Sequence, residues 1–290
     1  MDKDELIARR AAALAEDACF TRGRLRDEFR MKPAPGVEPV RWYKSNWGSR
    51  YGVYRIADCV PMREKRPPTE KQRRAGQRLA VLSRLNSPRG RLARNAHTWL
   101  SLAPLFLDTE TTGLGENAEA LEIGLTEADG RVAFETRLCP TVDIDPQAAA
   151  VHGITAPALR GEPSWPEVAA QLQRIIGARP LIIFNAPFDL RILKQTAAAH
   201  GDPAPWLDGL TVHCAMQLAA GYYGATNRYG SISLASAARE AGLTWQERAH
   251  SALADARMTA GVVAAIAADD LQLRRELASY DVAPPAEGQD

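Results

Sequence analysis

Apolar and polar residues alternate differently on the two sides of about residue 100. Beyond Leu105, short apolar runs of strand length are separated by longer segments in which apolar residues recur every three or four positions. Such alternation of strands and helices is typical of an α/β layer fold. The expected strands lie at 105–110, 120–126, 131–138 and 181–184. One expected helix starts at the capping box of Ser164 and Glu167, and three others cover 187–201, 233–241 and 252–268.

The first hundred residues show no such alternation, and prolines and glycines interrupt them. The expected elements are a helix at 3–18, a hairpin around SNWGS (45–49), a helix at 70–86 and a basic linker at 87–98. The chain therefore divides into a small basic N-terminal module with its linker (1–98), an α/β domain (101–272) and a partly disordered tail (273–290).

Charge is divided between the same two parts of the chain. Residues 1–100 hold 23 Lys and Arg against 11 Asp and Glu, whereas residues 101–290 hold 13 against 24. A basic segment indicates a polyanionic partner, because contacts with phosphates release condensed counterions. In the hairpin, aromatic residues alternate with arginines and lysines, a pattern typical of surfaces on which bases stack. The alternative is a hairpin whose aromatics pack inward, which we expect for at least Trp47 and Tyr54.

Two features of the sequence predict where in the cell the protein is found. MDKDELIARR lacks the apolar core of a signal peptide, and no uncharged apolar run is long enough to span a bilayer. We therefore expect a cytoplasmic protein with no membrane partner.

Candidate chemistry is concentrated in acidic residues beside the expected strands. Asp108 and Glu110 lie two residues apart on one strand, so both carboxylates leave the same face. Asp189 directly follows the strand at 181–184, and Asp255 comes five residues after His250. Desolvating paired carboxylates is costly unless a cation offsets the charge, and Mg²⁺ prefers oxygen ligands. Taken singly, Asp189 is better explained as a charge at the start of a helix, and Asp255 as a solvated helix residue.

Five ordered segments give these residues a common explanation. They are LFLDTETTGL (105–114), LEIG (121–124), VHGIT (151–155), NAPFD (185–189) and HSALADA (250–256). Together they resemble the DEDDh (DnaQ-like) 3′→5′ exonuclease family, which includes proofreading subunits of bacterial polymerases, RNase T and oligoribonuclease. The resemblance covers about residues 101–270 and implies a ribonuclease-H-like α/β domain with a mixed five-stranded sheet. Residues 1–98 have no part in it.

The resemblance also implies roles for individual residues. Asp108, Glu110, Asp189 and Asp255 would hold two Mg²⁺ or Mn²⁺ ions, and His250 would take the proton of the attacking water. The 3′-terminal nucleotide would be bound by Thr109, Thr111, Thr112, Gly113 and Leu114, together with Asn185 and Phe188. His152 belongs to the same expected pocket, although a lone histidine in a turn is as often structural.

The function implied by this resemblance is removal of nucleoside 5′-monophosphates from DNA 3′ ends. The substrate would be single-stranded or frayed DNA, with a role in DNA repair or proofreading and a possible replication or repair protein as partner. One alternative is a 3′→5′ exoribonuclease that uses the same site to trim RNA. Another is a non-catalytic nucleic-acid-binding adaptor, against which the complete set of acidic residues argues.

Overall fold

The computed structural model describes residues 2–63, 67–245 and 250–281, and the chain forms two compact units, 1–69 and 70–290. The predicted boundary near residue 98 falls inside a helix of the second unit. Within the described ranges, no helix combines the length and the apolar character needed to cross a lipid bilayer.

The N-terminal unit consists of two small antiparallel sheets and two helices. Its elements are α1 (Lys3–Ala15), β1 (Cys19–Thr21), α2 (Arg22–Phe29), β2 (Met31–Pro33), β3 (Arg41–Lys44), β4 (Arg50–Arg55) and β5 (Cys59–Pro61). One sheet has the order β1-β4-β3, and β2 pairs with β5. Leu25, Phe29 and Ile56 form the centre of a small core to which Tyr54 also belongs. Tyr54 is therefore packed inward, as predicted.

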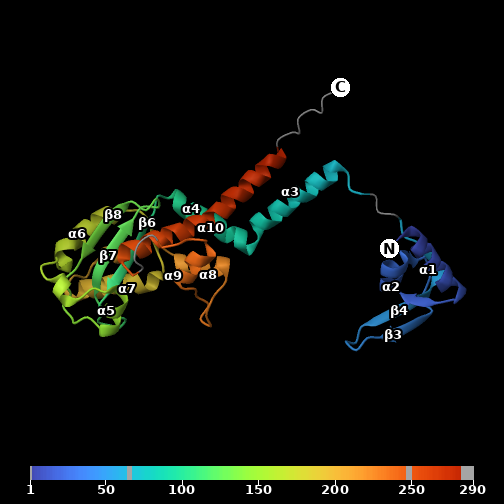
Figure 1. The fold of residues 1–290 in the computed structure, drawn as a ribbon, viewed down its shortest axis with the longest axis horizontal. Coiled ribbons are helices and arrows are strands. Elements are labelled where there is room, and N and C mark those ends of the chain that lie inside the picture. The colour runs from blue at the N-terminus through green and yellow to red at the C-terminus, as the bar shows by residue number, and fades with distance from the viewer. Residues whose placement is uncertain (1, 64–66, 246–249, 282–290) are drawn as a thin grey trace, which may run out of the picture. The chain divides into compact units, whose positions relative to one another are not determined.

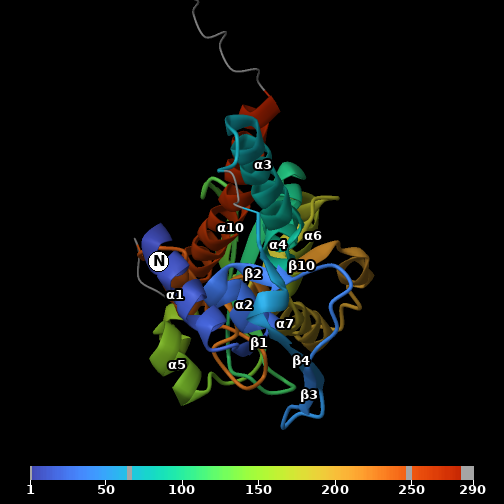
Figure 2. The same ribbon diagram turned by 90° about the vertical axis from the view of Figure 1, so that its right-hand side faces the viewer.

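The prediction that Trp47 packs inward is wrong. Trp47 lies in the turn between β3 and β4 and is 94% exposed. The turn is closed by main-chain hydrogen bonds from Ser45 to Ser49 (2.8 Å) and from Gly48 to Ser45 (3.0 Å). The β3–β4 hairpin extends away from α1 and α2 (Figures 1 and 2), so the Trp47 ring at its tip has no core to pack against.

The second unit is an α/β domain with the predicted mixed five-stranded sheet. The strands are β6 (Leu105–Thr111), β7 (Ala120–Thr126), β8 (Val132–Arg137), β9 (Leu181–Ile183) and β10 (Val212–Cys214), in the order β10-β9-β6-β7-β8. β10, β9 and β6 are parallel, whereas β7 is antiparallel to β6 and to β8. The central strand β6 is buried along most of its length, because helices cover both faces.

Helices form a layer on each side of this sheet (Figure 1). The helices of this unit are α3 (Glu70–Asn86), α4 (Pro88–Ser101), α5 (Pro146–His152), α6 (Trp165–Ile176), α7 (Ala186–Ala199), α8 (Ala215–Tyr223), α9 (Leu234–Glu240) and α10 (Ala252–Asp281). Of these, α3 extends away from the sheet beside the end of α10. α6 and α7 pack on the face that carries Leu107 and Ile183. α4, α8, α9 and α10 pack on the opposite face, around Phe106 and Ile182. The predicted capping box of Ser164 and Glu167 is present at the start of α6.

The predicted linker at 87–98 is wrong, because these residues form most of α4. Ser87 caps the helix through its hydroxyl, and Pro88 occupies the first turn, where a missing N–H costs nothing. Gly90 is required by a close helix crossing, since a Cβ there would lie 2.2 Å from the carbonyl oxygen of Arg84. Proline and glycine thus start a helix here instead of interrupting one.

The predicted tail at 273–290 is also wrong in its first part, since α10 continues to Asp281; residues 282–290 lie outside the described residues. The last turns of α10 pack against α3, with Leu273 beside Val81 and Leu85. Arginines of α3 form ion pairs with the same helix. These pairs are Arg78–Asp281 (3.2 Å) and Arg84–Glu276 (3.3 Å). Acidic residues of α10 therefore match two of the arginines of α3.

Candidate active site

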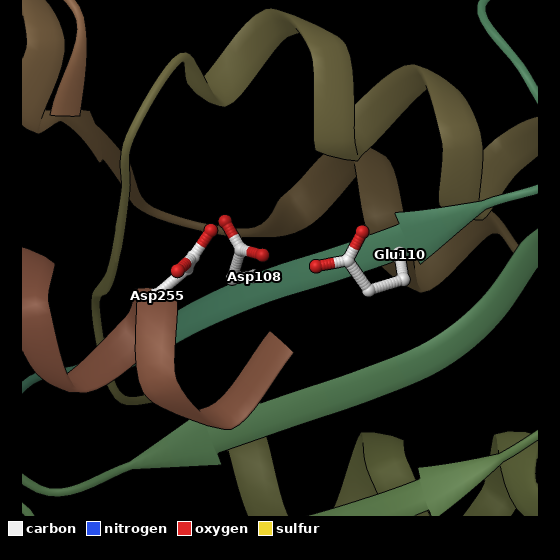
Figure 3. A group of neighbouring side chains, drawn as sticks. All are labelled: Asp108, Glu110 and Asp255. Carbon is white, nitrogen blue, oxygen red and sulfur yellow. The ribbon is translucent and has the colours of Figure 1, made fainter. Parts of the chain in front are cut away.

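Three carboxylates from two elements meet at the carboxyl end of β6. Asp108 and Glu110 project from one face of the strand, and Asp255 projects toward them from the first turn of α10 (Figure 3). One ligand oxygen of each residue lies within 4.8 Å of the other two. The structure thus brings three of the predicted site residues together.

The cluster is electrostatically costly when it is fully ionised. Burial, and after it the charges of Asp255 and Glu122, raise the pKa of Glu110 to about 8. Burial and the neighbouring carboxylates of Asp189 and Asp255 raise the pKa of Asp108 well above its usual range. The pKa of Asp255 is raised by burial as well. Among the described residues, no lysine or arginine forms a salt bridge with Asp108, Glu110 or Asp255.

Asp189 approaches the cluster from the opposite side of β6. It lies in the first turn of α7 and is buried, and its Oδ1 accepts hydrogen bonds from the main-chain N–H (3.1 Å) and the hydroxyl (2.8 Å) of Thr109. Burial raises the pKa of Asp189 to about 7, although the hydrogen bonds from Thr109 oppose the rise. Asp189 is outside the three-residue cluster, but it is the carboxylate that most strongly raises the pKa of Asp108.

The position of Asp255 depends on two residues of β7 to which the sequence assigned no role. Glu122 is buried, and its Oε1 accepts the main-chain N–H of Ala252 at the start of α10 (3.0 Å). At Gly124 a Cβ would lie 2.6 Å from the main-chain nitrogen of Leu253. The helix therefore begins directly on the strand. A charged residue and a glycine within an otherwise apolar strand are the signals that could have indicated this contact.

His250 borders the same cluster but is exposed. Its main-chain N–H lies 3.3 Å from Oδ1 of Asp255, and its φ of +66° is in the left-handed region. Residues 246–249, which precede it, lie outside the described residues. The predicted general base is thus next to one of the acidic residues and open to solvent.

The loop after β6 was predicted to bind the terminal nucleotide. Thr109, Thr111, Thr112 and Gly113 are buried, whereas Leu114 is 79% exposed. The hydroxyls of Thr111 and Thr112 form hydrogen bonds within the protein, with the Gly113 carbonyl oxygen (2.8 Å) and the Glu119 N–H (2.9 Å). These threonine side chains fix the loop, and Leu114 is its solvent-facing apolar side chain.

His152 is a buried member of the same region. Its Nδ1 accepts the N–H of Ile154 (3.0 Å), so its Nε2 carries the proton and donates to the carbonyl oxygen of Thr111 (3.2 Å). Burial lowers the pKa of His152 and keeps the ring neutral. Both ring nitrogens are engaged within the protein, which favours the structural alternative for this histidine.

The other two predicted pocket residues lie at the start of α7. Asn185 precedes the helix with a left-handed φ of +70°, a conformation that asparagine tolerates better than most residues. Phe188 is half-buried, and the guanidinium carbon of Arg191 lies 5.2 Å from the centroid of its ring. Both residues therefore lie at the start of the helix that carries Asp189.

Comparisons with known proteins agree with this geometry. Residues 105–263 match the family model described as Exonuclease. The chain is 35% identical over 182 residues to an uncharacterized exonuclease of Escherichia phage 186, covering 61% of this chain and 94% of that protein. It is 66% identical over 127 residues to an uncharacterized protein of Salmonella typhimurium strain LT2, covering 44% of this chain and 92% of that protein.

Two further similarities are to a polymerase subunit and to a solved exonuclease structure. Identity to the DNA polymerase III subunit epsilon of Escherichia coli K12 is 36% over 96 residues, 30% of this chain and 40% of that protein. A solved structure of exonuclease X in complex with 5′ overhanging duplex DNA aligns over 61% of this chain and 99% of its own, with 23% identity and a TM-score of 0.45. On the family match and the phage relative, the chain belongs to the DnaQ-like exonuclease family and is a nuclease.

Proposed function

We propose that the second unit removes nucleotides one at a time from DNA 3′ ends and releases them as 5′-monophosphates. The observation that supports this most strongly is the convergence of Asp108, Glu110 and Asp255, with raised pKa values and no salt bridge to a described lysine or arginine. Such a cluster of oxygen ligands suits hard divalent cations. Asp108, Glu110 and Asp255, with Asp189 beside them, would hold two Mg²⁺ or Mn²⁺ ions.

Two bound metal ions would stabilise the charge on the attacking and leaving oxygens of an in-line phosphodiester displacement. The protein's own contribution to proton transfer falls to His250, which is exposed beside Asp255. We assign it the proton of the attacking water, because imidazole is the side chain that most often serves as a general base. The new bond joins the water oxygen to phosphorus, and the bond from phosphorus to the 3′ oxygen breaks. The shortened strand keeps a protonated 3′ hydroxyl.

The terminal nucleotide would lie against the loop after β6. Leu114 offers its exposed side chain to the base, while the buried threonines hold the loop in place. Phe188 and Asn185 border the same region from α7, and His152 supports it through Thr111. The choice of DNA as substrate follows from similarity to polymerase subunits, which also makes a replication protein a candidate partner.

The test is digestion of 5′-labelled 20-nucleotide strands by the full-length protein. DNA and RNA strands with a 3′ hydroxyl or a 3′ phosphate are incubated with Mg²⁺, Mn²⁺ or EDTA. We expect a descending ladder from DNA with a free 3′ hydroxyl, mononucleotides with 5′ phosphates, and no products in EDTA. Asp108→Ala should be inactive, whereas Glu240→Ala, on the exposed surface of α9, should behave as wild type.

Three results would contradict the proposal in different ways. Digestion of RNA but not DNA would make the protein an exoribonuclease. If strands blocked by a 3′ phosphate were digested as fast as strands with a free 3′ hydroxyl, digestion would not start at the 3′ end. Full activity of Asp108→Ala would remove the assigned site.

A further inference from the structure

The three-stranded sheet of the N-terminal unit has one covered face and one uncovered face. Its register is regular, with Phe20 opposite Tyr54, and Tyr43 opposite Tyr51. Alternate residues therefore share a face. Phe20 and Tyr54 point to the core beneath α1 and α2. The other face carries Cys19, Thr21, Arg41, Tyr43, Tyr51, Val53 and Arg55, which we call the open face. All seven are exposed or half-buried.

Aromatic rings on the open face are arranged for stacking. Tyr43 and Tyr51 are cross-strand neighbours whose ring centroids lie 5.8 Å apart with an interplanar angle of 20°, and both rings are exposed. Trp47 at the tip of the same hairpin is almost entirely exposed. Exposing three large aromatic side chains is unfavourable in water, so their grouping indicates a ligand that stacks on them.

Positive charge surrounds these rings. Arg41 lies beside Tyr43, with its Nη1 3.4 Å from the tyrosine hydroxyl, and Arg55 stands at the other end of the face, paired with Asp17 (3.2 Å). Strands β1, β3 and β4 contain no aspartate or glutamate. Arg78 and Arg84 of α3 form ion pairs with α10, whereas Arg41 forms its hydrogen bond with the uncharged hydroxyl of Tyr43.

We propose that the open face and Trp47 bind single-stranded DNA, with bases stacked on the aromatic rings and phosphates beside Arg41 and Arg55. Stacking needs unpaired bases, whose faces a duplex hides, so the ligand is a single strand. That the strand is DNA rests on the proposed function, whereas the binding surface itself does not. This surface would hold a substrate while nucleotides are removed by the other unit.

The first test measures binding of fluorescent dT15 to the full-length protein in an Asp108→Ala background, so that the strand stays intact. Tyr43→Leu/Tyr51→Leu should weaken binding about tenfold or more, because each stacked base contributes substantially. Tyr43→Phe/Tyr51→Phe keeps the rings and should restore it. Trp42→Leu is the matched control, because Trp42 is also exposed but lies on the opposite face of β3. We expect it to change affinity less than twofold.

Salt dependence tests the arginines separately. Arg41→Gln should lower the slope of log K against log salt by about 0.7, the value for one phosphate contact of a single strand. Arg174→Gln, an exposed arginine of α6, should leave the slope unchanged. In a catalytically intact background, all these variants should cleave a dinucleotide at the wild-type rate. Loss of that cleavage would concern the proposed active site, not the open face.

Protection of a cysteine from alkylation provides an independent test, again in the Asp108→Ala background. Cys19 is an exposed thiol on the open face, and Cys139 is an exposed thiol of the other unit. Bound dT15 should slow alkylation of Cys19 and leave Cys139 unaffected. The proposal is overturned if Tyr43→Leu/Tyr51→Leu binds as wild type, if Trp42→Leu alone loses binding, or if rU15 binds and dT15 does not.

Discussion

The main-chain N–H of Ala252 donates a hydrogen bond to the buried carboxylate of Glu122, 130 residues earlier in the chain (3.0 Å). The other oxygen of this carboxylate accepts from Nε of Arg137 on β8 (2.9 Å). A single side chain thus joins the start of α10 to two strands of the sheet. Since Asp255 follows Ala252 by less than one helical turn, this contact sets where the third carboxylate of the cluster lies.

Replacing Glu122 should weaken metal binding although Glu122 is not one of the proposed metal ligands. Glu122→Leu leaves the N–H of Ala252 buried without an acceptor, which costs about 1–3 kcal/mol of folding free energy. Glu122→Gln keeps that acceptor but loses the ion pair with Arg137, so its effect should be smaller. Urea unfolding and calorimetric titration with Mn²⁺ measure the two effects. If Glu122→Leu binds Mn²⁺ as tightly as the surface control Glu240→Gln, Glu122 does not position Asp255.

The close contact at Gly124 gives a second prediction, with a control of opposite sign. Gly124→Ala places a methyl group 2.6 Å from the main-chain nitrogen of Leu253, so α10 must shift and stability should fall. Gly76→Ala, in α3, meets no atom within 4 Å and should stabilise the protein by up to about 1 kcal/mol. Thermal unfolding of both variants checks this. Equal effects would mean that the close approach at Gly124 is absent.

The stability of the metal-free protein should fall as pH rises, and bound metal should weaken this dependence. In the metal-free protein the pKa of Glu110 is raised to about 8 and that of Asp189 to about 7. The unfolded chain releases these protons at lower pH than the folded protein, so unfolding becomes easier as pH rises from about 5 to 8. Each unit by which a folded pKa exceeds the unfolded one corresponds to about 1.4 kcal/mol. His152, whose pKa is lowered by burial, acts in the opposite direction.

Urea unfolding in EDTA between pH 5.5 and 8 measures this slope, and comparison with Glu110→Gln isolates the carboxylate from the histidine. The variant should lose stability less steeply than wild type, and saturating Mg²⁺ should remove most of the wild-type decline. A wild-type slope that is unchanged in Glu110→Gln would show that Glu110 keeps an ordinary pKa.

The sequence predicted the site better than it predicted what supports the site. The placement of Asp108 and Glu110 follows from strand periodicity, which is a local property. The roles of Glu122 and Gly124 could not be predicted in this way, because each depends on a helix that lies more than 120 residues away. Likewise, Gly90 favours a linker when only the sequence is considered, because the close approach of α4 to the end of α3 is not visible there. Exposure of Trp47 depends on how far the hairpin extends beyond its helices.

His250 provides a test of proton transfer that is separate from metal binding. If it accepts the proton of the attacking water, His250→Gln should lower kcat by about 10²–10⁴-fold while the Mn²⁺ affinity stays within a few-fold of wild type. Unchanged kcat in His250→Gln, measured in single turnovers, would assign the proton to another group.

In the proposed function, carboxylates from β6 and α10 together form the metal site of a 3′ exonuclease. The most direct measurement compares two charge-removing variants of the same helix, Asp255→Asn at its first turn and Glu276→Gln near its end, in Mg²⁺-dependent digestion of a 5′-labelled DNA strand. Loss of a supporting residue around a metal typically costs 10–100-fold, so loss of a ligand should cost at least about 100-fold in Asp255→Asn. Glu276→Gln, which loses only an exposed ion pair with Arg84, should digest at the wild-type rate. Wild-type digestion by Asp255→Asn would contradict the account.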